Sequence, residues 1–195
     1  RNATSLFPKA QSVGFEKESS NNCHSQRPAR AARLRENCEP IPTTRLDWMV
    51  AQEETLRSNS KDDAQQQEQQ FINILLIDVE GWDFEVLQGG IATLARTEYL
   101  EFEYNWRGMW WTRKDDQPLR QAVMQLLNTD DLPFTCYWPG NSNDNDGKLW
   151  RITGCWLPHY DGLFWSNVVC VNRVLAPVLA ERMEQVFLKT IGEQQ

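Results

Sequence analysis

The clearest pattern in the sequence is a short hydrophobic run that ends abruptly in acidic residues. Residues 72–77 read Ile-Asn-Ile-Leu-Leu-Ile, a nearly continuous aliphatic segment typical of a parallel strand buried on both faces. After an acidic loop, apolar residues recur at helical spacing between 84 and 94 and predict one amphipathic helix of about three turns. A second strand-like run follows at 99–104. Strand, helix and strand in this order predict a βαβ unit with parallel strands.

Further elements are predicted on both sides of this unit. Upstream, Thr44 and Asp47 have the spacing of a capping box, in which the two side chains cap the first turn of a helix reciprocally. Downstream, the patterns predict a helix at 119–128, strands at 134–138, 149–152 and 167–172, and a last helix at 175–191. The predicted fold class is α/β, with a mostly parallel sheet and an antiparallel edge.

Composition and charge narrow the possible partners. A hydrophobic fraction of 41% and an aromatic fraction of 11% are typical of a globular protein, and no apolar run is long enough to predict a transmembrane helix. Residues 36–105 carry fifteen acidic and four basic side chains, whereas residues 1–35 carry two acidic and seven basic ones. An acidic middle repels phosphate backbones, so neither nucleic acid nor a membrane is an expected partner. The sequence carries no signal for a compartment or an oligomeric state.

Cysteine and metal motifs are sparse. Five cysteines cannot all pair within one chain and none forms a C-x-x-C pair, so neither a disulfide scaffold nor a zinc site is expected. Cys170 lies in an apolar run and is predicted to be a small core residue. Residues 142–147 are similar to a calcium loop, but Thr153 stands where such a loop has glutamate. No metal site is therefore predicted.

Candidate chemistry gathers where the two strands of the βαβ unit end. Ligands of open α/β sheets bind beyond the carboxyl ends of the strands. Asp78 and Glu80 follow the first strand, and Glu103 and Asn105 end the second. Two carboxylates facing one cavity suit a general base or a wall that binds a cation. The alternative is that Asp78 merely starts the following helix, since acidic residues stabilise helix N-termini, and Glu80 is open to the same interpretation.

Three tryptophans lie just beyond the second strand. Trp106, Trp110 and Trp111 are candidates for a platform on which an acceptor substrate stacks, because indole faces pack on sugar rings and other apolar faces. The alternative is that they pack in the core. The other tryptophans of the C-terminal region are predicted to be structural: Trp138, Trp150, Trp156 and Trp165.

The acidic segment resembles a known motif. Ile77-Asp78-Val79-Glu80-Gly81, followed by Asp83-Phe84-Glu85-Val86-Leu87-Gln88-Gly89-Gly90, is similar to the central motif of the FkbM family of S-adenosylmethionine-dependent methyltransferases. The segments 43–47 and 100–103 are similar to the family's preceding "T-L-D" segment and to its next strand. The resemblance runs from about residue 42 to residue 105 and covers a third of the chain.

The resemblance implies a Rossmann-like fold and transfer of a methyl group from S-adenosylmethionine to a hydroxyl oxygen of a small-molecule or glycan acceptor. It implies that Asp78 and Val79 contact the cofactor. Asp78, Glu80 and Glu103 are then the candidate catalytic residues, and Asn105 and the three tryptophans beyond it are the candidate acceptor-binding residues.

One departure from the family pattern concerns the cofactor. Related methyltransferases bind it through a glycine-rich turn, D-x-G-x-x-x-G, but here only Gly14 precedes Gly81. The resemblance places that turn before Arg1, so we expect the C-terminal part of a longer enzyme, inactive alone. The expected organisation is a single partial methyltransferase domain, with a loop-rich remnant at 1–41, the motif-bearing core at 42–105 and a C-terminal α/β part at 106–195. The alternative is a non-catalytic module that binds a glycan or a protein.

Overall fold

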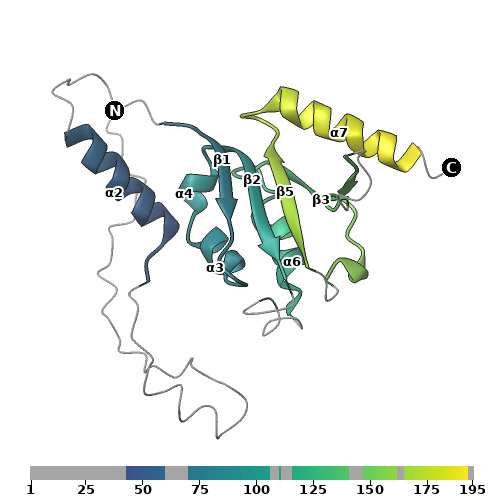
Figure 1. Ribbon diagram of the computed structural model, residues 1–195, viewed down its shortest axis with the longest axis horizontal. Coiled ribbons are helices and arrows are strands. Elements are labelled where there is room, and N and C mark those ends of the chain that lie inside the picture. The colour runs from purple at the N-terminus through teal and green to yellow at the C-terminus, as the bar shows by residue number, and fades with distance from the viewer. Residues whose placement is uncertain are drawn as a thin grey trace, which may run out of the picture. The chain divides into compact units, whose positions relative to one another are not determined.

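The structure, a computed structural model, describes residues 43–59, 70–105, 110, 116–140, 147–161 and 165–192. It divides the chain into two units, Arg1–Thr43 and Thr44–Gln195. The predicted remnant at 1–41 lies outside the described residues. Within the second unit, a five-stranded sheet carries helices on both faces (Figure 1).

The described elements follow one another as helix, strand, helices, strand, helices, strands and a final helix. In chain order they are α2 (Leu46–Asn59), β1 (Ile72–Ile77), α3 (Asp83–Gln88), α4 (Ile91–Leu94), β2 (Thr97–Tyr104), α6 (Pro118–Arg120), the π-helix η2 (Gln121–Leu126), β3 (Phe134–Pro139), β4 (Leu149–Arg151), the 3-10 helix η3 (Pro158–Asp161), β5 (Ser166–Asn172) and α7 (Pro177–Gly192).

The sheet is mixed, with strand order β1-β2-β5-β3-β4. β1 and β2 are parallel, which confirms the predicted βαβ pairing, and Ile77 lies opposite Phe102. β5 inserts between β2 and β3 and runs antiparallel to both, and β4 is antiparallel to β3. The antiparallel edge is confirmed. The expectation of a mostly parallel sheet is corrected for the described strands, because the returning strand β5 makes the pairs on either side of it antiparallel.

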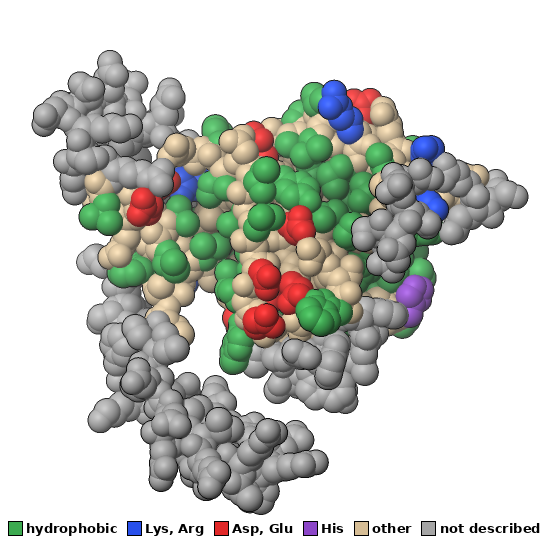
Figure 2. Space-filling view, viewed as in Figure 1, with side chains coloured by type: hydrophobic (Ala, Val, Ile, Leu, Met, Phe, Trp, Pro, Cys, Tyr) green, Lys and Arg blue, Asp and Glu red, His purple; other side chains and the backbone are tan. Residues whose placement is uncertain are grey.

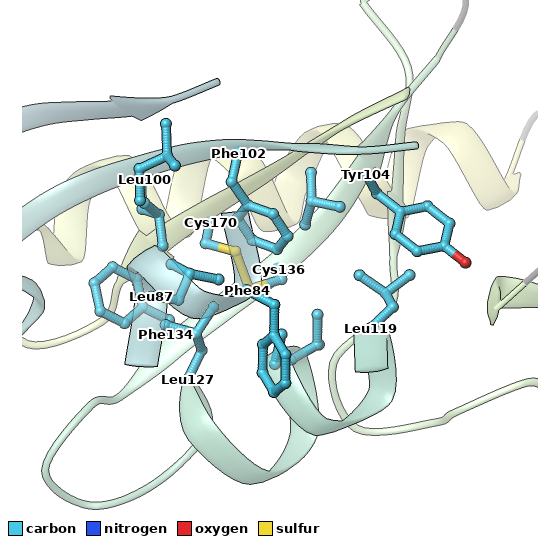
Figure 3. Close-up of a cluster of buried hydrophobic side chains, with 14 of the residues drawn as sticks. Phe84, Leu87, Leu100, Phe102, Tyr104, Leu119, Leu127, Phe134, Cys136 and Cys170 are labelled. Atoms are coloured by element: carbon cyan, nitrogen blue, oxygen red, sulfur yellow. A yellow bond between two sulfur atoms is a disulfide. The ribbon is translucent and has the colours of Figure 1, made fainter. Parts of the chain in front are cut away.

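The core fills both faces of the sheet between strands and helices. On one face, the helical residues Phe84 and Leu87 pack with Leu100 and Phe102 of β2, and the same cluster extends to the disulfide between β3 and β5 (Figure 3). On the other face, Met183 of α7 packs with Tyr137, Val169 and Val171. Each strand alternates its side chains between the two faces, so β2 and β5 contribute to both clusters.

β1 is not buried on both faces, contrary to the prediction from its hydrophobic run. Ile77 is buried, but Ile74 and Leu76 on the opposite face are 63% and 66% exposed. β1 forms one edge of the described sheet, and α7 covers the same face only over β5 and its neighbours. Hydrophobic composition predicts what a strand is able to bury, whereas its place in the sheet decides what is covered.

The helix predicted between 84 and 94 is two helices, α3 and α4, separated at Gly89 and Gly90. α2 packs closely against this break: a Cβ atom added at Gly90 would lie only 2.8 Å from Cδ2 of Leu46. A side chain at this position would require the flexible end of Leu46 to move, and glycine avoids that rearrangement.

The helix predicted from the capping box is confirmed as α2, but the box itself does not form. The helix begins at Leu46, and Arg45 provides the first carbonyl oxygen that accepts from helical N–H groups. The carboxylate of Asp47 instead accepts hydrogen bonds from the backbone N–H groups of Ala92 and Thr93 and from the Thr93 hydroxyl. Asp47 therefore caps α4, because an acceptor satisfies the free N–H groups of whichever helix start lies nearest.

One disulfide corrects the expectation from the cysteine count. Cys136 of β3 and Cys170 of β5 lie directly opposite each other and form a disulfide, and both are buried. Cys170 is a core residue, as predicted, but it is covalently linked. An odd number of cysteines does not exclude a single bridge, which depends on strand register rather than on spacing along the chain.

We predict that replacing this pair in the double variant Cys136→Ala/Cys170→Ala lowers the free energy of unfolding by about 3 kcal/mol, because the bridge closes a 34-residue separation in the unfolded chain. Guanidinium unfolding followed by circular dichroism measures the change. Cys155→Ala, at the exposed unpaired cysteine, is the control. A double variant no less stable than the control contradicts the prediction.

Candidate functional site

The site lies where the parallel strands β1 and β2 end. Because Ile77 pairs with Phe102, the loop that follows β1 runs beside the end of β2, and Asp78 enters it next to Glu103. Asp78, Val79 and Glu80 are all exposed in this loop. The alternative in which Asp78 starts the next helix is wrong, since α3 begins five residues later at Asp83. The structure therefore brings the three predicted carboxylates to one edge of the sheet.

A buried carboxylate joins the two strand ends. Asp83 is fully buried, and its Oδ2 accepts a hydrogen bond of 3.2 Å from the backbone N–H of Gly81. Its Oδ1 accepts one of 3.3 Å from the backbone N–H of Glu103. One side chain thus connects the loop that carries Asp78 and Glu80 to the strand end that carries Glu103.

Sequence reasoning did not single out Asp83. It is the first residue of α3, where an acidic side chain is favourable on its own account, and no local pattern shows that it reaches across to the next strand. The available signal was an acidic residue two positions after Gly81, close enough to accept a hydrogen bond from the backbone N–H of that glycine.

Burial raises the pKa of the Asp83 carboxyl from 3.8 to about 6, and the nearby Glu103 carboxylate adds to the rise, while backbone N–H hydrogen bonds oppose it. Between pH 3.8 and about 6, the native protein therefore keeps a proton on Asp83, whereas the unfolded chain has released it. Below pH 3.8 this contribution to stability is complete, and it is lost as the pH rises through 6.

We predict that the wild type exceeds Asp83→Asn in free energy of unfolding by about 1 kcal/mol more at pH 5 than at pH 7. The native wild type loses the proton of its Asp83 carboxyl over this range, whereas the asparagine amide of the variant does not titrate. Chemical unfolding at both pH values measures the difference. Gln52→Ala, an exposed uncharged position on α2, is the control whose difference from wild type stays constant. A constant difference for Asp83→Asn would remove the carboxyl from this pH dependence.

The loop after β1 turns through an uncommon backbone conformation. Glu80 has φ of 53° and Gly81 has φ of 94°. The left-handed region costs a non-glycine residue roughly 1 kcal/mol, since its Cβ crowds the backbone. Glycine suits the second position, whereas glutamate at the first is strained and exposed. Strain of this kind gathers at functional sites.

Glu103 is held on both of its carboxylate oxygens. Asn105 Nδ2 donates to Oε2 at 2.6 Å, and the indole N–H of Trp165 donates to Oε1. Asn105 is itself buried and holds Glu103, while its predicted contact with an acceptor stays a prediction. A carboxylate has about four acceptor positions, so Glu103 still has lone pairs for a ligand.

The tryptophans are distributed differently from the prediction. Trp110 is only 2% exposed and packs on the rings of Phe84, Phe102 and Tyr104. Its assignment to an acceptor platform is wrong, and the core-packing alternative describes it. Trp106 and Trp111 lie outside the described residues. Trp165, predicted to be structural, is 64% exposed beside Glu103. The exposure of Trp165 was not predictable, because a hydrophobic pattern does not show whether a single residue that precedes a strand is buried.

Comparison with known protein families places this site in context. Residues 4–132, about two thirds of the chain, match the methyltransferase FkbM domain. The chain belongs to the FkbM methyltransferase family. The match includes β1, α3, α4, β2 and all three predicted catalytic carboxylates, and it extends beyond the resemblance read from the sequence at both ends. No curated protein and no solved structure matches the chain.

The described residues of this FkbM-family protein contain no group of three or more His, Cys, Asp and Glu side chains arranged to hold a metal ion. Among the same residues, every helix is too short or too polar to cross a membrane.

Proposed function

We propose that this FkbM-family protein transfers a methyl group from S-adenosylmethionine to a hydroxyl oxygen of a small-molecule or glycan acceptor, and that its sheet is the C-terminal part of a Rossmann-like fold. One observation carries the proposal. The carboxylates Asp78, Glu80 and Glu103 share the carboxyl edge of two parallel strands joined by Asp83, within the segment that matches the methyltransferase domain.

The residues at this edge fit the proposed cofactor by their charge. S-adenosylmethionine, when bound, supplies a methyl group on a positively charged sulfur. Asp78 and Val79 are exposed where β1 ends and would hold it. Acidic side chains gather beyond the ends of β1 and β2, while the visible Lys and Arg side chains lie elsewhere on this face (Figure 2). A negative wall stabilises a cation by direct Coulomb attraction.

The chain's own contribution to the reaction is orientation and proton removal. Glu103 is fixed by its two donors and accepts, through a remaining lone pair, a hydrogen bond from a second hydroxyl group of the acceptor, next to the one that is methylated. Glu80, exposed in the strained turn, takes the hydroxyl proton as general base. Holding the oxygen in line for attack removes much of the entropic barrier, which is the main demand of such a transfer.

We predict that Asp78→Asn in the complete protein lowers methyl transfer at least about tenfold, because the carboxylate nearest the cationic donor is neutralised. Transfer of labelled methyl groups is measured together with binding of S-adenosylmethionine by calorimetry. Asp131→Asn, at an exposed aspartate in the turn before β3, is the matched control. Unchanged turnover removes Asp78 from the mechanism, and absence of cofactor binding by the wild type favours the non-catalytic binding module.

Replacing Glu80 separates strain from function. We predict that Glu80→Gly raises the free energy of unfolding by roughly 0.5–1 kcal/mol, since glycine accepts the left-handed conformation freely, yet lowers methyl transfer at least about tenfold. Gln117 has a similar φ of 52° near the start of α6, so Gln117→Gly is expected to stabilise comparably and leave activity intact. Thermal unfolding and methyl transfer are measured on both. Full activity in Glu80→Gly contradicts the assignment of the base.

A further inference from the structure

Trp165 occupies the acceptor side of the proposed site because of strand register. β5 runs antiparallel to β2, and its first residue, Ser166, pairs with Tyr104, the last residue of β2. Trp165 precedes Ser166 and therefore lies beyond the carboxyl end of β2. This is the edge at which open α/β sheets bind ligands. The indole is thus an aromatic surface placed by a strand that lies outside the predicted βαβ unit.

The position of the indole is fixed while its ring stays open to solvent. Its N–H donates to Oε1 of Glu103, a hydrogen bond to a charged group and so stronger than a neutral one. The side chain is nevertheless 64% exposed. Because the ring is held by its polar atom, its exposed area lies close to the carboxylate, and little conformational freedom is lost when a ligand packs on it.

The acidic side chains near Trp165 favour one chemical class of ring as its ligand. Acidic side chains lie beside an exposed hydrophobic one beyond the ends of β1 and β2 (Figure 2). Carboxylates accept hydrogen bonds from hydroxyl groups and repel phosphates and other carboxylates. An indole face packs on the apolar face of a saturated or aromatic ring.

We propose that Trp165 is an acceptor-binding residue, and that the acceptor is an uncharged ring bearing hydroxyl groups, as in a neutral sugar. The ring packs on the indole while one hydroxyl hydrogen-bonds to Glu103. This assignment rests on the proposed methyl transfer and names the acceptor class for the same site.

Two substitutions separate the ring from its N–H group. Trp165→Phe keeps an aromatic face and removes the donor to Glu103, whereas Trp165→Ala removes both. We predict that Trp165→Ala raises the acceptor KM at least about tenfold, equivalent to 1.4 kcal/mol of binding, with a smaller effect on kcat. Trp165→Phe raises KM by at most about threefold. Trp48→Ala, at a 54% exposed tryptophan on α2, leaves KM unchanged.

The assay uses the complete protein with labelled S-adenosylmethionine and a panel of neutral methyl glycosides, their 6-phosphates and the corresponding uronic acids. Transfer to neutral glycosides, with the KM pattern above, supports the proposal. Preference for the charged members, or an unchanged KM in Trp165→Ala, overturns it. If the cofactor binds in calorimetry but no glycoside is methylated, the acceptor class is wrong while the proposed function stands. If the cofactor does not bind, the proposed function itself fails.

Discussion

The arrangement of the site depends on one buried carboxylate that accepts hydrogen bonds from two strand ends. Asp83 connects the Gly81 N–H to the Glu103 N–H. Burying a charge is unfavourable, which is why the pKa of this carboxyl rises. The two N–H groups it accepts from would otherwise lack partners in the interior, so the cost of burial is offset by the satisfaction of the backbone.

The order of elements was predictable because each has a local cause. Alternating or continuous hydrophobic patterns predicted β1, β2, β3, β4 and β5, and apolar residues at helical spacing predicted α7. The helix predicted at 119–128 is instead the short helix α6 followed by the π-helix η2, and no pattern predicted η3. What depends on contact between distant residues was not predictable. The contact of Leu46 with Gly90, where α3 and α4 divide, and the cap that Asp47 provides for α4 both join residues more than forty positions apart.

In the candidate site too, some features were predictable from the sequence and others were not. Asp78, Glu80 and Glu103 follow hydrophobic runs, so their position at strand ends was readable from the sequence, and the parallel pairing of β1 and β2 brings them together. Trp110 and Trp165 were misassigned because aromatic residues serve equally well in a core and on a binding surface. Burial separates Trp110 from Trp165, and burial is decided by which strands become neighbours, here β5 beside β2.

The carboxyl edge of β1 and β2 combines residues from two parts of the chain. The matched segment ends at residue 132 and contains Asp78, proposed to face the donor, together with Glu80 and Glu103, proposed to act on the acceptor, whereas Trp165 lies beyond it on the approach to β5. The hydrogen bond from Trp165 to Glu103 is where the two parts meet. Changing residues before β5 would alter the surface offered to an acceptor without disturbing Asp83 or the loop after β1. In the proposed site, the residue facing the donor therefore comes from the matched segment, whereas the acceptor-binding residues come from both parts of the chain.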